Sequence, residues 1–140
     1  MKLVTRIAFV LLFVPLVASA QFRDLDAAMS NLDRGFGAGD VQAIVAGIGD
    51  GEQVMLQFPG LSDQSGFFGR DQATYLLDGV FSKVKPSSFE RVNARKSSAD
   101  GQYHITARWT INGGEVRDLY VTLQKKGDRY SVASVRSASK

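Results

Sequence analysis

The chain of 140 residues contains no cysteine and only one histidine, and these shortages exclude several kinds of site. Without cysteine there can be no disulfide, no thiolate ligand for a metal and no lipid-modified cysteine as an anchor. No group of histidine and carboxylate residues has the spacing of a metal site. We therefore predict no metal and no cofactor, and we expect the fold to be stabilised by its hydrophobic core.

The chain also lacks an apolar run long enough to cross a membrane, although it begins with a short one. Lys2 and Arg6 are basic, residues 7–17 are apolar, and residues 18–20 are small. These three parts in this order are typical of a secretory signal peptide, whereas a membrane anchor needs roughly 20 apolar residues. We predict cleavage of residues 1–20, no membrane anchor afterwards, and one exported domain over residues 21–140, either periplasmic or secreted.

Net charge is almost absent from this expected mature domain. Lys2 and Arg6 are two of the 17 basic residues, so 15 remain against 14 acidic ones. Residues 21–80 hold 3 basic and 9 acidic side chains, whereas residues 81–140 hold 12 and 5. This asymmetry is consistent with an anion-binding face, or with acidic helices that lie over a basic sheet. For an exported protein of balanced charge, we expect no nucleic-acid partner.

The first half of the chain has the apolar spacing of helices. Large apolar residues from Phe22 to Phe36 recur at steps of three and four, which predicts a helix that ends at the glycines of residues 35–39. Asp40 is placed to cap a second, short helix. Two short strands are expected at residues 53–58 and 67–68. A third helix should begin at Arg70 and end before Pro86, because proline cannot continue a helix.

From residue 88 onward the apolar spacing changes to two, which is typical of strands. Strands are expected at residues 89–94, 103–111, 116–124 and 130–135. The alternation within residues 89–94 is irregular, and a bulge is one explanation of it. Turns are expected at residues 98–101, 112–114 and 125–128. The sequence therefore predicts an α+β fold in the order α-α-β-β-α-β-β-β-β, with three helices packed on a curved, mostly antiparallel sheet.

Several short motifs occur in a recognisable order along the chain. They are Gly37-Ala38-Gly39-Asp40, Phe81, Lys85-Pro86-Ser87-Ser88-Phe89, Gly101-Gln102-Tyr103, Leu119-Tyr120-Val121-Thr122-Leu123 and Lys125-Lys126-Gly127-Asp128-Arg129-Tyr130. Together they resemble the nuclear transport factor 2-like fold, also called cystatin-like, and within it the bacterial family called domain of unknown function 4783. The resemblance implies a cone-shaped fold and export from a Gram-negative bacterium. It implies no activity and no site residues.

Along residues 103–111 the inward face of the expected sheet carries only apolar and aromatic side chains. Such a face can line a pocket for a small apolar ligand, or it can simply fill the cone. The candidate pocket residues are Phe58, Leu77, Phe81, Tyr103, Trp109 and Tyr130.

The opposite face of the sheet carries one aromatic residue, Tyr120, among Thr106, Arg108 and Thr122. A polar face with one aromatic is consistent with a protein-partner or homodimer interface, and also with plain exposure to solvent. These four residues are the candidate interface.

Relatives in the wider superfamily include enzymes that use an acid or base inside the cone, where burial shifts its pKa. Asp50, Glu52 and Asp78 are the carboxylates that could point inward, and a dyad of His104 with Asp118 is possible on the outer face. We assign no catalytic residue. The leading hypothesis is non-catalytic binding of a small apolar ligand or a protein partner. The alternatives are a small isomerase, dehydratase or hydrolase, and a dimeric structural interaction module.

Overall fold

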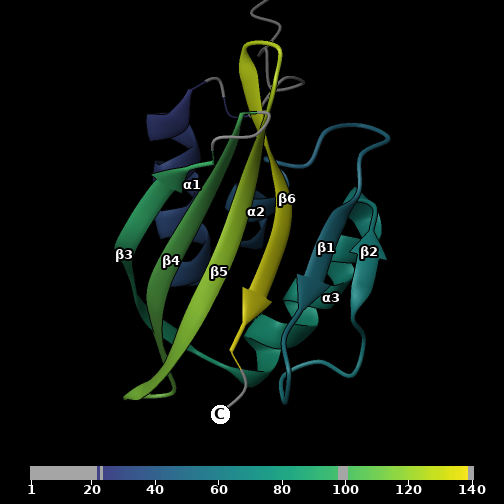
Figure 1. Cartoon of the computed structure of the whole chain (residues 1–140). Coiled ribbons are helices and arrows are strands. Elements are labelled where there is room, and N and C mark those ends of the chain that lie inside the picture. Colours follow the sequence, from purple (N-terminus) through teal and green to yellow (C-terminus); the bar gives the residue numbers. More distant parts are fainter. Residues whose placement is uncertain (1–21, 23, 98–100, 139–140) are drawn as a thin grey trace, which may run out of the picture.

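The computed structural model describes residue 22, residues 24–97 and residues 101–138. Its elements are α1 (Leu25–Ala38), α2 (Val41–Val45), β1 (Val54–Gln57), β2 (Gly66–Phe68), α3 (Arg70–Lys83), β3 (Pro86–Lys96), β4 (Gln102–Ile111), β5 (Glu115–Lys126) and β6 (Arg129–Ser137). This is the predicted order of helices and strands, so the predicted fold class is confirmed (Figure 1). The expected signal peptide lies outside the described residues.

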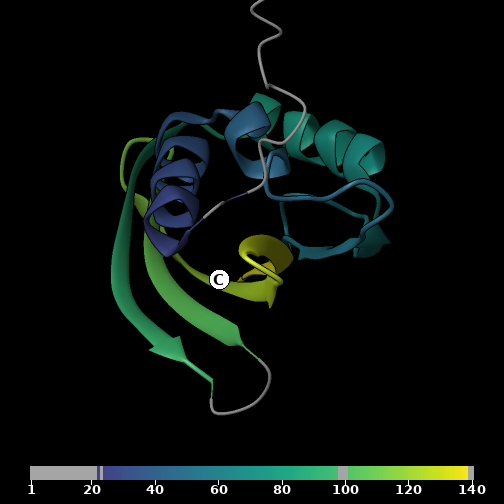
Figure 2. The ribbon, with the colours of Figure 1, turned by 90° about the horizontal axis from the view of Figure 1, so that it is seen from above.

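The six strands form one sheet in the order β2-β1-β6-β5-β4-β3. Neighbouring strands are antiparallel except β1 and β6, which are parallel. Figure 2 shows the sheet curving around the helices, which lie on its concave side. Strand β6, the last in sequence, therefore lies inside the sheet between β1 and β5.

Helix α1 begins three residues later than its apolar spacing suggests. Asp24 is the N-cap, and its carboxylate accepts a hydrogen bond from the amide of Ala27 at 2.7 Å. Phe22 lies outside the helix, where its carbonyl accepts from the amide of Tyr130 at 2.8 Å and its side chain is buried. The first apolar residue of the pattern is therefore part of the core but belongs to a bridge with β6.

The other end of α1 lies within the predicted glycine-rich stretch, at Ala38, after the helix has passed through two glycines. Gly39 ends it with φ of 74°, a conformation that glycine adopts at low cost. Gly35 stays helical and admits the side chain of Ile44 from α2, since a Cβ at Gly35 would lie 2.3 Å from Ile44 Cγ1. This glycine serves close packing of α1 on α2 rather than helix termination.

Strand β3 is longer than predicted and carries the bulge that its irregular alternation indicated. Its register with β4 shifts between Arg91 and Asn93. The predicted turn at residues 112–114 is confirmed by positive φ angles of 51° at Asn112 and 77° at Gly113. Residues 98–100 of the predicted first turn lie outside the described residues.

Candidate functional site

Trp109 occupies the centre of the concave side of the sheet. It is fully buried, and its indole Nε1–H donates to the carbonyl oxygen of Phe36 at 2.8 Å. Its ring centroid lies 5.8 Å from that of Phe36, 6.1 Å from that of Phe81 and 6.4 Å from that of Phe58. Leu77 is buried in the same core. Four of the predicted pocket residues therefore pack in one region of the core.

The other two predicted pocket residues lie elsewhere along the sheet. Tyr103 and Tyr130 are half-buried and make an edge-to-face contact at 5.8 Å. Tyr103 is six residues from Trp109 on β4, which corresponds to about 20 Å of strand. The six residues thus form two groups, four around Trp109 and the pair Tyr103 and Tyr130. That either group lines a ligand pocket stays a prediction.

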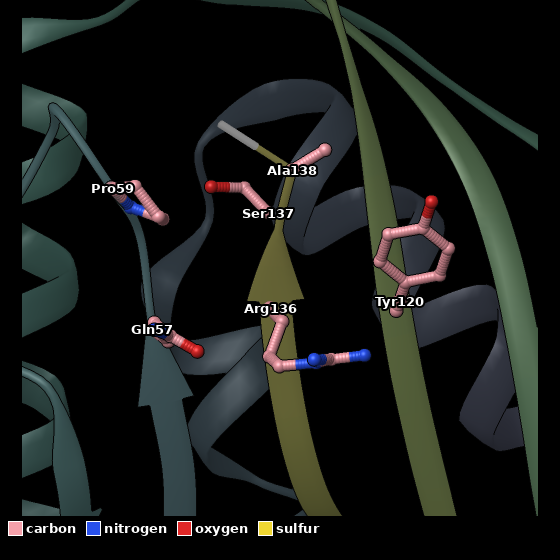
Figure 3. Close-up of a pocket in the computed structure, with 6 residues that line it drawn as sticks. All are labelled: Gln57, Pro59, Tyr120, Arg136, Ser137 and Ala138. Carbon is pink, nitrogen blue, oxygen red and sulfur yellow. The ribbon is translucent and has the colours of Figure 1, made fainter. Parts of the chain in front are cut away.

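Three hollows in the described part of the surface are lined by other residues. Two lie along α3 and share Gln64 and Tyr75, with volumes of about 330 and 200 Å³. The third has a volume of about 240 Å³ and lies at the ends of β1 and β6 (Figure 3). We call it the β1–β6 notch, and its lining residues are Gln57, Pro59, Tyr120, Arg136, Ser137 and Ala138.

The β1–β6 notch opens where two parallel strands separate. Gln57 and Arg136 are the last residues that pair between β1 and β6. The chain beyond Gln57 turns at Pro59, whereas β6 continues to Ser137, which pairs with Leu119 of β5. The guanidinium of Arg136 lies over the ring of Tyr120, 5.6 Å from its centroid. Ser137 is only 5% exposed, and among the described residues its hydroxyl oxygen has no hydrogen-bond partner. The notch therefore presents a positive charge and an aromatic ring, whereas the neighbouring Ser137 hydroxyl oxygen is buried.

A buried arginine holds the Pro59 side of the notch in place. Arg117 Nη1–H donates to the carbonyl oxygen of Pro59 at 2.8 Å, and Arg117 Nε lies 3.1 Å from the carboxylate of Glu115. Arg117 is not among the residues predicted for a site, although Leu119, Val121 and Leu123 alternate on the buried face of the same strand. Extending the same alternation back by two positions places Arg117 on the core face.

The four predicted interface residues lie together on the convex side of the sheet. In the β4–β5 register, Thr106 is opposite Tyr120 and Arg108 is opposite Asp118. We call this surface the outer sheet face, and it comprises His104, Thr106, Arg108, Asp118, Tyr120 and Thr122. Tyr120 is 38% exposed at its centre.

The possible dyad of His104 with Asp118 is not formed. His104 is opposite Thr122, and its Nδ1 lies 3.2 Å from the hydroxyl oxygen of Thr122. Asp118 is opposite Arg108 and precedes Thr122 by four positions on β5, which is about 13 Å of strand. The two side chains share a face but are too far apart for proton transfer.

With the fold and these surfaces established, the chain can be compared with known proteins. A family model described as "Domain of unknown function (DUF4783)" matches residues 29–137. The chain belongs to the DUF4783 family. No protein with a curated description matches it.

Solved structures agree with this assignment. A DUF4783 family protein from Bacteroides fragilis is 19% identical with a TM-score of 0.65, and the match covers 79% of this chain and 96% of that one. A protein with a ketosteroid isomerase-like fold from Catenulispora acidiphila, solved with trimethylamine, is 11% identical with a TM-score of 0.58, covering 81% and 85%. An NTF-2 like protein of unknown function from Silicibacter pomeroyi is 14% identical with a TM-score of 0.53, covering 83% and 92%. These likenesses establish the NTF2-like fold for this DUF4783 chain.

Because one neighbour has an isomerase-like fold, the three candidate carboxylates need to be placed. Asp50 is 93% exposed and pairs with Arg70 Nη1 at 2.9 Å, and Asp78 is exposed on α3. Glu52 is half-buried, which by itself would raise its pKa. Hydrogen bonds from Lys126 Nζ at 3.0 Å and the Gly49 amide at 2.8 Å outweigh that burial, so the pKa of Glu52 is lowered. A carboxyl group that acts as a general acid inside the cone needs a raised pKa instead.

Two further kinds of site were tested on residues 22, 24–97 and 101–138. Within these residues, no group of three or more histidine, cysteine and acidic side chains could hold a metal ion. Over the same residues, no helix combines the length and apolar character needed to cross a membrane.

Proposed function

We propose that this DUF4783 protein is an exported, non-catalytic binding domain that contacts a protein partner through its outer sheet face. The observation that carries the proposal is the exposed ring of Tyr120 at the centre of a sheet face rich in hydroxyl groups, on the side away from the helices. Tyrosine and arginine are enriched at protein interfaces, where their large side chains supply much of the binding energy.

The charges on this face favour a second copy of the chain as the partner to test first. Arg108 and Asp118 are opposite each other in the register, so the face carries both signs of charge side by side. A surface that pairs with itself about a two-fold axis needs groups that complement one another in this way. Export follows from the expected signal peptide and remains part of the proposal.

A small apolar ligand inside the cone is less well supported. The space around Trp109 is occupied by Phe36, Phe58 and Phe81, and the indole N–H is already bonded to the backbone. An enzyme with an inward carboxylate is weakened by the exposure of Asp50 and the lowered pKa of Glu52. Protein binding is thus the function that fits the geometry best.

Sedimentation velocity of the mature protein tests this proposal. We expect wild type to dimerise, and we expect Tyr120→Asp and Arg108→Glu each to weaken the dimer at least about tenfold, because each places a repulsive or desolvated charge in the interface. Tyr75→Asp is the matched control, since Tyr75 is 80% exposed on α3, away from the sheet face. A dimer that all three variants preserve would contradict the proposed interface.

A monomeric wild type would require a different partner, and photo-crosslinking in cells then tests the face. A photo-reactive residue placed at Thr122 should give an adduct, whereas the same residue at Gln72 on α3 should not. If Thr122 gives no adduct and wild type is monomeric, the outer sheet face is not a binding surface.

A further inference from the structure

The first described residue of the chain, Phe22, is built into the fold through both its backbone and its side chain. Its carbonyl oxygen accepts a hydrogen bond from the amide of Tyr130 at 2.8 Å, and the two residues form an antiparallel bridge. Its side chain is 1% exposed and belongs to the hydrophobic core. We call this position of Phe22 docked. The core therefore includes a residue that precedes the first helix.

A glycine makes room for the ring of Phe22. An added Cβ at Gly47 would lie 2.3 Å from Phe22 Cε2 and 2.6 Å from Phe22 Cζ, so the ring packs directly against the backbone of this glycine. The carbonyl oxygen of Gly47 accepts from the amide of Val132 at 2.8 Å. Phe22 and Gly47 thus bond to the start of β6, ahead of Ser134, where pairing with β1 begins.

One residue separates docked Phe22 from the expected cleavage bond between Ala20 and Gln21. Consecutive Cα atoms are about 3.8 Å apart, so the Cα of Ala20 lies within about 8 Å of the Cα of Phe22 in any conformation. Further along the chain, Asp24 is fixed as the N-cap of α1. The segment that follows the bond therefore cannot extend away from the domain while Phe22 is docked.

Docking of Phe22 and cleavage ahead of it make opposite demands on the same segment. A protease needs residues on both sides of its bond that can enter the active site, so cleavage beside a folded region proceeds through a transiently opened state. Opening here removes the Phe22 ring from the core and breaks the hydrogen bond to Tyr130. The folded domain thus opposes cleavage with the burial of one large aromatic side chain.

We infer that docking of Phe22 protects the bond between Ala20 and Gln21, so that removal of the signal peptide must precede folding of this end of the chain. Cleavage hydrolyses that bond with one water molecule and leaves the carboxylate of Ala20 and the amine of Gln21. Phe22 then completes the core, whereas a precursor that folds first keeps its signal peptide. The inference rests on the export that is part of the proposed function, and it does not involve the outer sheet face.

Cleavage of the folded precursor, residues 1–140, by purified bacterial signal peptidase in detergent micelles tests the inference. A synthetic peptide of residues 1–30 is the reference, because it carries the cleavage site without the fold. We expect the precursor to lose residues 1–20 at least about tenfold more slowly than the peptide, since a buried aromatic residue must first undock. Mass spectrometry measures both rates and identifies the bond that is cut, and near-UV circular dichroism checks that the precursor is folded.

Gly47→Ala separates docking of Phe22 from recognition of the cleavage site. Its added Cβ displaces the ring of Phe22 and leaves the sequence around the bond unchanged, so we expect the folded precursor to be cut at least about fivefold faster. Gly79→Ala is the matched control, because its added Cβ has nothing within 4 Å, and it should not speed cleavage. Val80→Ala, at a buried position of α3, controls for loss of overall stability and should change the rate less than about twofold.

Three results would overturn the inference. These are a folded precursor that is cut as fast as the peptide, an unchanged rate in Gly47→Ala, and equal acceleration by Gly47→Ala and Val80→Ala, which would assign the effect to unfolding of the whole domain. Failure of the proposed export gives a different result, because the peptide of residues 1–30 then stays uncut between Ala20 and Gln21. In that case the inference falls together with the export.

Discussion

The two faces of strands β4 and β5 differ in almost every property, although they consist of alternating residues of the same strands. On the concave side, Ile105, Ala107 and Trp109 are at most 1% exposed beneath the helices. On the convex side, His104, Thr106 and Arg108 alternate with them and meet solvent. The comparison teaches that the concave face supplies the hydrophobic core, and that the binding we propose would use side chains that the core does not need. The predictions below test that division.

The largest effect is expected from Trp109. Trp109→Ala should lower the free energy of unfolding by about 3–5 kcal/mol, because it opens a cavity against Phe36, Phe58 and Phe81 and leaves the Phe36 carbonyl unbonded. Urea denaturation monitored by circular dichroism measures this loss. Tyr120→Ala, on the convex face, should change the same quantity by no more than about 0.5 kcal/mol. If both variants lost the same free energy of unfolding, the two faces would contribute equally to stability, contrary to our expectation.

A smaller but still clear loss is expected at Gly47, which packs beside the core. A Cβ at this position would lie 2.3 Å from Phe22 Cε2 and 2.7 Å from Val132 Cγ2, so Gly47→Ala should destabilise by about 1–3 kcal/mol. Gly79 provides the matched control, because it lies on the exposed side of α3 with nothing within 4 Å of its added Cβ. Gly79→Ala should stabilise by about 0.5–1 kcal/mol. Thermal melts should show a lower melting temperature for Gly47→Ala and a higher one for Gly79→Ala than for wild type.

The next effect depends on pH and concerns Glu52. Since folding lowers the pKa of Glu52, its contribution to stability is present above the unfolded value near 4.5 and is lost as the pH falls through the lower folded value. Glu52→Gln should cost no more than about 1 kcal/mol at pH 7 and should flatten the decline of stability below about pH 4.5. Urea titrations at a series of pH values measure the free energy of unfolding of both proteins. A steeper decline in the variant would contradict the direction of the pKa shift.

The smallest effect on stability is expected from Arg108. Arg108→Glu changes an exposed side chain opposite Asp118, and two like charges facing each other on neighbouring strands cost about 0.5 kcal/mol or less. A melting temperature within a few degrees of wild type, combined with a changed sedimentation profile, would separate binding from folding on this face. A large drop in melting temperature would show that the convex face also stabilises the fold.

The apolar spacing, three and four in the helices and two in the strands, predicted the fold class and both faces of β4. Helix ends were less predictable, because Gly35 remains helical for a reason that lies in α2, namely the close approach of Ile44. The candidate site was harder still. The notch depends on the parallel pairing of β1 with β6, which joins residues about eighty positions apart in sequence, and no local pattern near Gln57 or Arg136 reports that pairing.

The same pairing has a consequence for the order of events in folding. Strand β6 follows the other described elements along the chain, yet β1, β5, Phe22 and Gly47 all hydrogen-bond to it. Until β6 is available, β1 and β2 form only a two-stranded ribbon, which is unstable in water on its own. Contacts between residues so distant in sequence close slowly, because the entropy of a long loop must be lost first. The strand order thus makes formation of the complete sheet depend on β6, which lies between β1 and β5.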